Sequence, residues 1–170
     1  MIQRLAKILL VLLMAIYLLL VGIDNLLDYG SNFAFVQHVM SMDLIAPDNP
    51  LIGRAITNPT AHHVVYALII AAEIGAGLLC VVGALRLFAA RHAPAARFAA
   101  RKALAVAGLM LAIALYFCGF MTIAAEWFQM WQASSFNGQQ AAFRLIVCFG
   151  IALIFLCLPE HELDETGRPR

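Results

Sequence analysis

The sequence has few charged residues. Only 12% of its 170 residues are Asp, Glu, Lys or Arg, whereas 64% are hydrophobic and the mean hydropathy is +0.88. A soluble domain is about one quarter charged, so this chain has too little polar surface to be solvated as a globule in water. The 11 basic and 10 acidic residues give a net charge of +1, without the basic excess of nucleic-acid-binding proteins. The composition predicts a membrane protein with the lipid bilayer as partner, and no nucleic-acid partner.

The sequence also lacks the short motifs of common enzyme and metal sites. None of its 4 cysteines forms a Cys-x-x-Cys pair, and all lie in apolar runs. This favours packing between helices over a disulfide framework or a zinc site. The sequence contains no glycine-rich phosphate loop, nucleophile elbow or His-Glu-x-x-His motif. We therefore expect no catalytic residues, no bound metal and no cofactor.

Long apolar stretches are what the sequence does have. A helix that crosses the bilayer needs roughly 20 mostly apolar residues. Four stretches qualify, at residues 5–23, 64–85, 104–125 and 141–158. The first is longer than the apolar core of a secretory signal, and no small-residue cleavage motif follows it. The sequence predicts one all-α integral membrane domain over residues 1–170, a bundle of four transmembrane helices.

Basic residues are expected mostly on one side of these spans. They occur at the N-terminus, in the link between the second and third spans, and at the C-terminus. These residues are Arg4, Lys7, Arg86, Arg91, Arg97, Arg101, Lys102, Arg168 and Arg170. The opposite side has only Arg54 and Arg144. Because Lys and Arg mark the cytoplasmic side, we expect both termini in the cytoplasm. The basic link is interpreted as this topology signal, reinforced by anionic lipid, rather than as a dedicated partner site.

The loop between the first two spans, residues 24–57, is too long for a simple connector. Within it, Phe33, Val36 and Met40 share one helical face. This pattern predicts an amphipathic helix that lies on the outer membrane surface or over the bundle.

Capping residues predict where helices begin in this region. Ser31 and Asn32 precede the amphipathic helix as capping residues. Residues 51–56 predict one further helical turn. Asn58, followed by Pro59, predicts the start of the helix that forms the second span.

Five strings along the chain resemble those of one family. The strings are DYGSNFAFVQHVMSMD (28–43), RAIT (54–57), HH (62–63), EWFQMWQ (126–132) and NGQQAAFR (137–144). The family is the domain of unknown function 2165 family, described as predicted small integral membrane proteins of bacteria. The similarity extends over nearly the whole chain, although Ala124-Ala125 and Phe136 stand where the family often has two glycines and a tryptophan. The resemblance implies a multi-pass, four-span protein of the bacterial inner membrane, and it implies no reaction.

Several ionisable residues fall at or beyond the middle of the predicted spans on the outer side. Glu73 lies about halfway along the second span, and Arg144 lies near the start of the fourth. A charge at the bilayer centre is costly, so such residues usually face a partner or water. The residues predicted to line an outward-facing, ligand-binding polar vestibule are Arg54, His62, His63, Glu73, Glu126 and Arg144.

The sequence leaves several roles open for these polar residues. Glu73 or Glu126 could form a buried ion pair with Arg144 that fixes helix register. The vestibule could instead bind a small ligand, an ion or a lipid headgroup, or Glu73 could stay unpaired and protonated, which suits a proton-coupled role. A copper site is a weaker alternative, because thioether and imidazole groups suit copper. Its ligands would come from His38, Met40, Met42, His62 and His63.

The sequence therefore predicts a non-enzymatic membrane protein, either an accessory subunit or a small-ligand binder with an outward-facing vestibule. One alternative is a transporter for a small solute or ion, coupled to protons through Glu73. Four spans are too few to enclose an alternating-access path in one chain, and no inverted repeat is visible, so a transporter would need to be an oligomer. Besides lipid, the partners to expect are further copies of this chain in a homo-oligomer, or the subunits of a larger membrane complex. Another alternative is a quinone- or metal-linked redox component.

Overall fold

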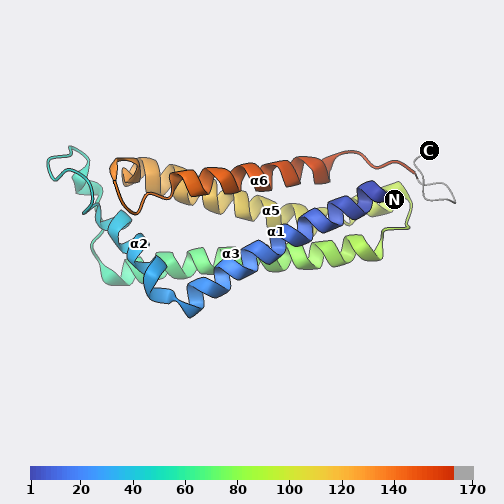
Figure 1. Ribbon diagram of the computed structural model, residues 1–170, viewed down its shortest axis with the longest axis horizontal. Helices are drawn as coiled ribbons and strands as arrows, with labels where there is room; N and C mark the ends of the chain where they lie inside the picture. Colours follow the sequence, from blue (N-terminus) through green and yellow to red (C-terminus); the bar gives the residue numbers. More distant parts are fainter. Residues whose placement is uncertain (163–170) are drawn as a thin grey trace.

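The computed structural model describes residues 1–162 and, in that range, consists of helices and the loops that join them. Four helical segments are long and apolar enough to cross a membrane, and they lie together as an elongated bundle (Figure 1). They are α1 (Ile2–Leu27), α3 (Pro59–Ala89), the segment Ala95–Trp127 and α6 (Gln139–Cys157). The predicted all-α, four-span architecture is confirmed. The first three spans extend beyond the predicted stretches at both ends, because helical hydrogen bonding continues into the flanking residues.

The third span is built from three consecutive helices. These are α4 (Ala95–Ala100), α5 (Ala103–Ala114) and the π-helix η2 (Leu115–Trp127). The wider turn of η2 is visible where the Phe128 backbone N–H donates to the Ile123 carbonyl, five residues earlier, at 3.0 Å. π-Helical turns are rare and are frequently found at functional sites.

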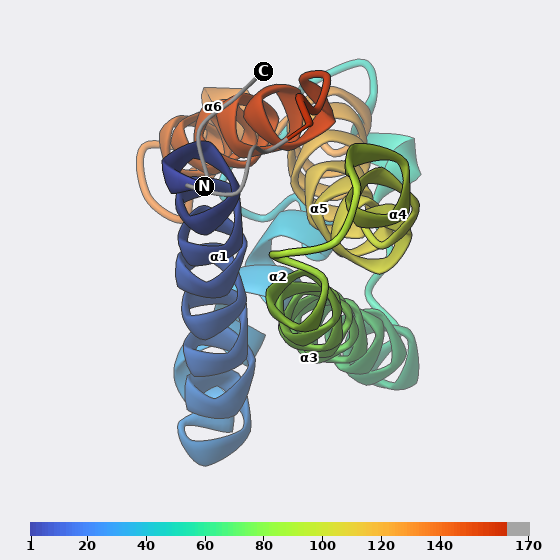
Figure 2. The ribbon, with the colours of Figure 1, turned by 90° about the vertical axis from the view of Figure 1, so that its right-hand side faces the viewer.

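Figure 2 shows the four spans from the end of the bundle at which the N-terminus lies. Their shared core contains small residues, such as Ala76 and Ala112, and large ones, such as Phe149. α1 packs along α3, α3 packs along α5, and α6 packs on α5 and η2, whereas α1 and α6 make little contact with each other. The α3–α5 contact is especially close: a Cβ atom added to Gly83 would lie 2.5 Å from the Ala105 backbone nitrogen. A Cβ atom at Gly108 would lie 2.6 Å from the Cys80 sulfur. Small residues at such contacts let membrane helices approach closely.

The outside of the bundle is apolar. Large side chains such as those of Leu68 and Ile154 are exposed along it, as expected of a surface that faces lipid. Of the cysteines, only Cys80 packs between helices as predicted. That prediction is wrong for Cys118, Cys148 and Cys157, which are exposed because they lie on the outward faces of their helices.

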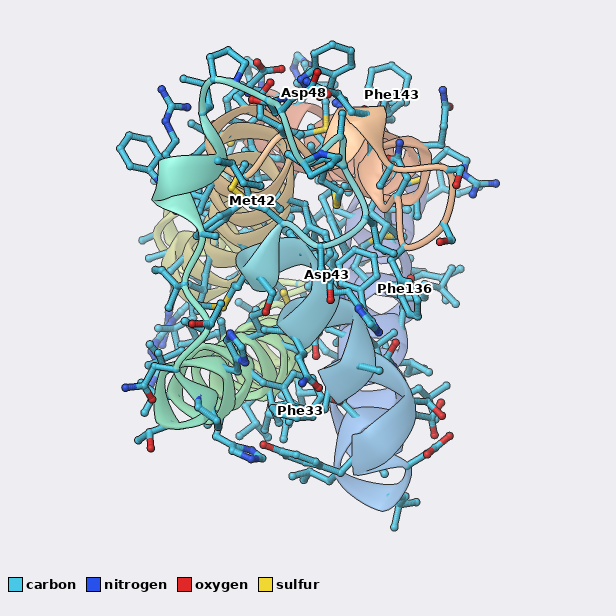
Figure 3. All side chains as sticks on the ribbon, turned by 90° about the vertical axis from the view of Figure 1, so that its left-hand side faces the viewer. Phe33, Met42, Asp43, Asp48, Phe136 and Phe143 are labelled. Carbon is cyan, nitrogen blue, oxygen red and sulfur yellow. The ribbon has the colours of Figure 1, made fainter. Side chains whose placement is uncertain are left out.

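The helix α2 (Tyr29–Ser41) lies across one end of the bundle. Figure 3 shows the bundle from this end. We call this the loop end. Val36 and Met40 are buried beneath α2 and Phe33 is partly buried, so the predicted amphipathic helix is confirmed. The predicted capping by Ser31 and Asn32 is wrong, because α2 begins at Tyr29, directly after α1.

Two further predictions for this loop are confirmed. The single turn η1 (Ile52–Arg54) forms within the predicted stretch. The Asn58 side-chain oxygen accepts hydrogen bonds from the backbone N–H groups of Thr60 at 2.9 Å and Ala61 at 3.4 Å, which caps α3. A second single turn, η3 (Met130–Gln132), connects η2 towards α6.

The opposite end of the bundle, the terminal end, is held by charged groups around Glu160. Lys7 and Lys102 both donate to the Glu160 carboxylate, Lys102 at 2.6 Å, and the Arg4 Nε lies 3.8 Å from it. The side chains of Arg4 and Lys7 are only 2% exposed, and that of Glu160 is 5% exposed. These contacts join the start of α1, the start of α5 and the segment after α6. We call this group the Glu160 cluster.

The Glu160 carboxyl is stabilised in its charged form. Burial alone would raise its pKa, but the hydrogen bonds from Lys102 and Lys7, together with their positive charges, outweigh that effect. The pKa of Glu160 is therefore held below its ordinary value of 4.5.

Candidate functional site

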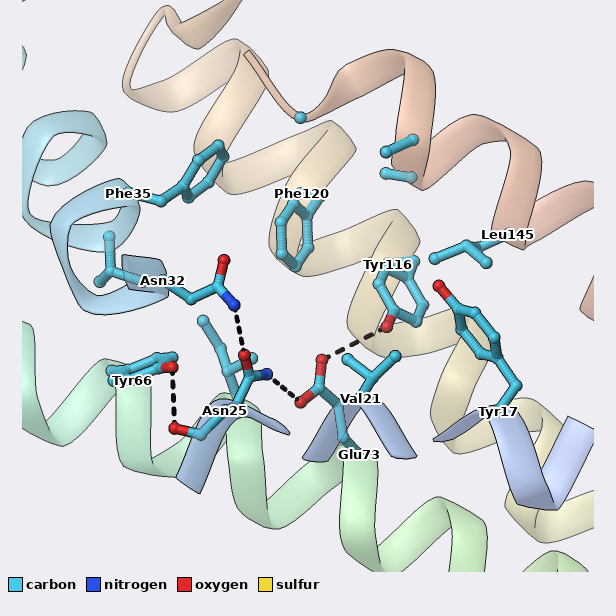
Figure 4. Close-up of a pocket in the computed structure, with 15 residues that line it drawn as sticks. Tyr17, Val21, Asn25, Asn32, Phe35, Tyr66, Glu73, Tyr116, Phe120 and Leu145 are labelled. Carbon is cyan, nitrogen blue, oxygen red and sulfur yellow. Dashed lines mark hydrogen bonds between the residues drawn. The ribbon is translucent and has the colours of Figure 1, made fainter. Parts of the chain in front are cut away.

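A cavity of about 260 Å³ lies inside the bundle below α2 (Figure 4). Side chains from α1, α2, α3, η2 and α6 line it. Its depth follows from Glu73, which lies about 21 Å from the Pro59 end of α3 at 1.5 Å per residue, close to the helix midpoint. The cavity therefore reaches the middle of the span. We call it the Glu73 cavity.

Glu73 is 2% exposed and is held by two neutral donors. The Asn25 amide nitrogen donates to one carboxylate oxygen at 2.7 Å, and the Tyr116 hydroxyl donates to the other at 3.3 Å. Asn25 is itself fixed, since its amide oxygen accepts from Asn32 at 2.6 Å and its backbone carbonyl accepts from the Tyr66 hydroxyl at 3.2 Å. Figure 4 shows this chain of hydrogen bonds converging on Glu73. The carboxylate is thus oriented by side chains from four elements.

Within residues 1–162, Glu73 has no basic partner. The ion pairs of this part of the chain are those of the Glu160 cluster and one between His38 and Asp43. A buried carboxylate is costly unless a cation or sufficient hydrogen bonds compensate it. Each carboxylate oxygen accepts one protein hydrogen bond here and has capacity for more.

Aromatic rings form much of the wall around this carboxylate. Five of them line the cavity: Tyr17, Phe35, Tyr66, Tyr116 and Phe120. The rings of Tyr116 and Phe120 are 5.5 Å apart between centroids. An aromatic ring carries negative charge on its faces, and ring faces therefore attract cations.

The cavity is closed towards the terminal end and reaches the surface at its side. Below Glu73 the space is filled by buried residues such as Leu18, Cys80 and Phe149, each completely inaccessible. Tyr17, in contrast, lines the cavity and is 39% exposed. Leu145 lines it from α6, across the seam where α1 and α6 make little contact.

The six residues predicted for the vestibule do not line one cavity, and only Glu73 lies in this one. His62 is buried under the loop, where its Nε2 donates to the Ile56 carbonyl at 2.6 Å and its Nδ1 has no hydrogen-bond partner. His63 is exposed. Its ring stacks on Phe33 with centroids 4.1 Å apart, and its Nδ1 shares a hydrogen bond with the Tyr29 hydroxyl at 2.8 Å.

Arg54 and Glu126 line a separate, open pocket beside Trp127. The Arg54 guanidinium lies 4.5 Å from the centroid of the Trp127 ring and donates to the Trp127 carbonyl at 3.3 Å. This pocket is distinct from the Glu73 cavity, because the two share no lining residue.

The ion pair of Arg144 with Glu73 or Glu126, one of the alternatives that the sequence left open, does not form among the described residues. Arg144 is exposed, and its Nε donates to the Gln140 backbone carbonyl at 3.2 Å. The reason is helix register. α6 begins at Gln139, which turns Ala142 and Leu145 towards the cavity and Arg144 away from it.

The histidines and methionines considered for copper also lie apart. His38 pairs with Asp43 at 3.0 Å, while Met40 and Met42 are buried in an apolar cluster. In the part of the chain that the structure describes, no three His, Cys, Asp or Glu residues gather in a way that could hold a metal ion. The residues of the alternative copper site therefore do not come together.

Sequence reasoning missed Asn25, Asn32 and Tyr116. Asn25 had a signal: it continues the buried stripe of α1 that runs through Leu18 and Gly22 at helical spacing. Tyr116 lies at the start of the π-helix, where the ordinary helical period no longer predicts direction.

The model of the family of predicted small integral membrane proteins (DUF2165) matches residues 3–159. No curated protein and no solved structure matches the chain. The matched region covers nearly all of the four spans, α2 and every residue of the Glu73 cavity. The chain belongs to the DUF2165 family of predicted small integral membrane proteins.

Proposed function

We propose that this protein is a non-enzymatic membrane binder of a small organic cation, a protonated amine or a quaternary ammonium ion, in the Glu73 cavity. One observation carries the proposal: a buried carboxylate, held by two neutral donors, faces a cavity with aromatic walls. A cation in this cavity would neutralise Glu73 and lie against ring faces, which is how proteins recognise ammonium groups.

The size of the cavity favours a small ligand. Its volume of about 260 Å³ is below the usual range of pockets for drug-sized ligands, which begins at about 300 Å³. The packed core below Glu73 favours binding over transport, because the described bundle offers no polar path from the cavity to the terminal end. Tyr17 and Leu145 mark the side from which a ligand enters.

We also propose that the cavity belongs to the outer half of a bacterial inner-membrane protein whose termini are both cytoplasmic. The support is the excess of Lys and Arg at the terminal end. Reporter fusions in the α3–α4 link, near residue 95, should report the cytoplasm, and fusions near Ser134 should report the outer side. The opposite pattern would reverse the assignment and make the cavity face inward.

The binding proposal is tested by calorimetric titration of the purified protein in detergent. The probes are methylammonium, tetramethylammonium and choline, with dimethylbutanol as the neutral carbon isostere of choline. A desolvated cation–π contact contributes about 2 kcal/mol, so we expect at least one cation to bind roughly tenfold or more tightly than the isostere.

Two variants locate the site. Glu73→Gln keeps the shape of the side chain and should abolish the preference for the cation. Glu126→Gln removes an exposed carboxylate outside the cavity and should leave binding unchanged. If no probe cation binds, or if Glu73→Gln retains the preference, the proposed function is wrong.

A further inference from the structure

Another cavity, of about 320 Å³, lies between the end of α3 and α4 at the terminal end, which faces the viewer in Figure 2. Three arginines and three alanines line it: Arg86, Ala89, Ala90, Ala93, Arg97 and Arg101. The alanines leave space at the floor, and the arginines place three positive charges around that space.

The structure distinguishes these three arginines from the other basic residues of the same link. Arg91 folds onto the Phe88 ring, 4.1 Å from its centroid, and donates to the Phe88 carbonyl at 2.9 Å. Lys102 is held by Glu160. Arg86, Arg97 and Arg101 are exposed, and within residues 1–162 their guanidinium groups have no acidic partner and no hydrogen-bond acceptor. In the described part of the chain, the arginines whose side chains lack a partner are thus the ones that share a cavity.

Hydrogen bonds from Arg4 and Glu162 hold the backbone of the turn between α3 and α4. Arg4 donates to the carbonyls of Arg91 at 3.0 Å and Ala93 at 2.6 Å, and the Glu162 carboxylate accepts from the Ala95 backbone N–H at 3.1 Å. The three guanidinium groups are therefore carried by a braced turn. Like charges around one space repel each other, and an anion between them removes that repulsion.

We propose that this cavity, the arginine pocket, binds the phosphate group of an anionic phospholipid. The guanidinium fork matches phosphate oxygens in pairs, which gives a charge-assisted contact. A lipid is favoured as the source of the phosphate because the pocket lies at the ends of membrane-spanning helices. Val82, one turn deeper than Arg86 on α3, is 41% exposed, and Leu85 is 63% exposed. These side chains provide an apolar surface for acyl chains, and basic pockets of this kind bind anionic headgroups.

The test is native mass spectrometry of the purified protein in detergent, titrated with phosphatidylglycerol or with phosphatidylcholine. We expect phosphatidylglycerol to bind more tightly. Arg97→Gln and Arg101→Gln should each weaken its binding about fivefold, the factor expected for one basic residue near an anionic lipid. The matched control is Arg91→Gln, which removes the same charge from the same link but lies outside the pocket. It should weaken binding by less than about twofold, because Arg91 is engaged by Phe88.

Three results would overturn the proposal. Equal losses for Arg91→Gln and Arg97→Gln would show diffuse attraction without a site. Equal binding of the two lipids would show that the negative charge is not recognised. Displacement of phosphatidylglycerol by inorganic phosphate at the same concentration would assign the pocket to the free anion instead. This last arm uses the wild-type protein, so it decides the question even if a variant is unstable.

Discussion

Replacing Glu160 by Gln should destabilise the bundle more than any other loss of a single carboxylate at the terminal end. Glu160 neutralises Lys7 and Lys102 directly and lies 3.8 Å from Arg4. Arg4 and Lys7 are almost fully buried. The variant keeps the size of the side chain but leaves these cations without their anion.

The expected loss can be estimated from the contacts that remain. Removing one partner of a buried ion pair costs about 3–5 kcal/mol. Arg4 keeps its bonds to the Arg91 and Ala93 carbonyls, and Lys7 keeps its bond to the Leu158 carbonyl, so we expect the lower end of that range, about 3 kcal/mol. For a chain of this length, 1 kcal/mol shifts the melting temperature by about 2–4 °C, so the predicted decrease is roughly 6–12 °C.

The assay is thermal unfolding of the purified protein in detergent, followed by circular dichroism. Glu162→Gln is the matched control, because Glu162 is an exposed carboxylate two residues further along whose hydrogen bond within residues 1–162 is to the Ala95 N–H. Its loss should cost about 1 kcal/mol, as for other helix-capping groups. If Glu160→Gln lowers the melting temperature no more than Glu162→Gln does, the Glu160 cluster does not stabilise the fold.

Two further predictions concern acidification and helix packing. Because the pKa of Glu160 is lower in the folded state than its ordinary 4.5, its contribution to stability is complete above pH 4.5 and is lost as the pH falls through the folded-state pKa. Melting temperatures measured during acidification below pH 4.5 should therefore fall more steeply for the wild type than for Glu160→Gln. Gly83→Val places a side chain 2.5 Å from the Ala105 backbone, whereas a Cβ at Gly150 meets nothing within 4 Å. Gly83→Val should cost at least about 1–3 kcal/mol in the same assay and Gly150→Ala almost nothing, and equal effects would refute the close α3–α5 contact.

The sequence predicts the spans well because their signal is local. An apolar run longer than about 17 residues is typical of a transmembrane helix. Asn58-Pro59 marks a helix start because Asn caps the first turn and Pro fits the first helical position. The buried position of Glu73 was also predictable, since a carboxylate in the middle of an apolar span faces polar groups or water inside the bundle rather than lipid. These features depend on neighbours in the chain.

The partners of the buried groups were not predictable in the same way. Whether Arg144 or Tyr116 meets Glu73 depends on the rotation of α6 and on the π-helical turn of η2, which single-sequence periodicity does not fix. The Glu160 cluster joins Glu160 to Lys7, 153 positions earlier, and to Lys102, so no local pattern indicates it. Asn25 is the exception, because the buried stripe of α1 leads to it.

The central claim, that a cation binds against the Glu73 carboxylate, can be measured on that carboxyl group itself. A membrane-permeant carbodiimide adds to buried carboxyl groups in their protonated form, and mass spectrometry of the peptide that contains Glu73 reports the extent of the reaction. A bound cation holds Glu73 charged and covers it. We predict that the probe cation that binds in the titrations slows the labelling of Glu73, whereas dimethylbutanol does not. Labelling of Glu73 at the same rate with and without the cation would contradict the proposed function.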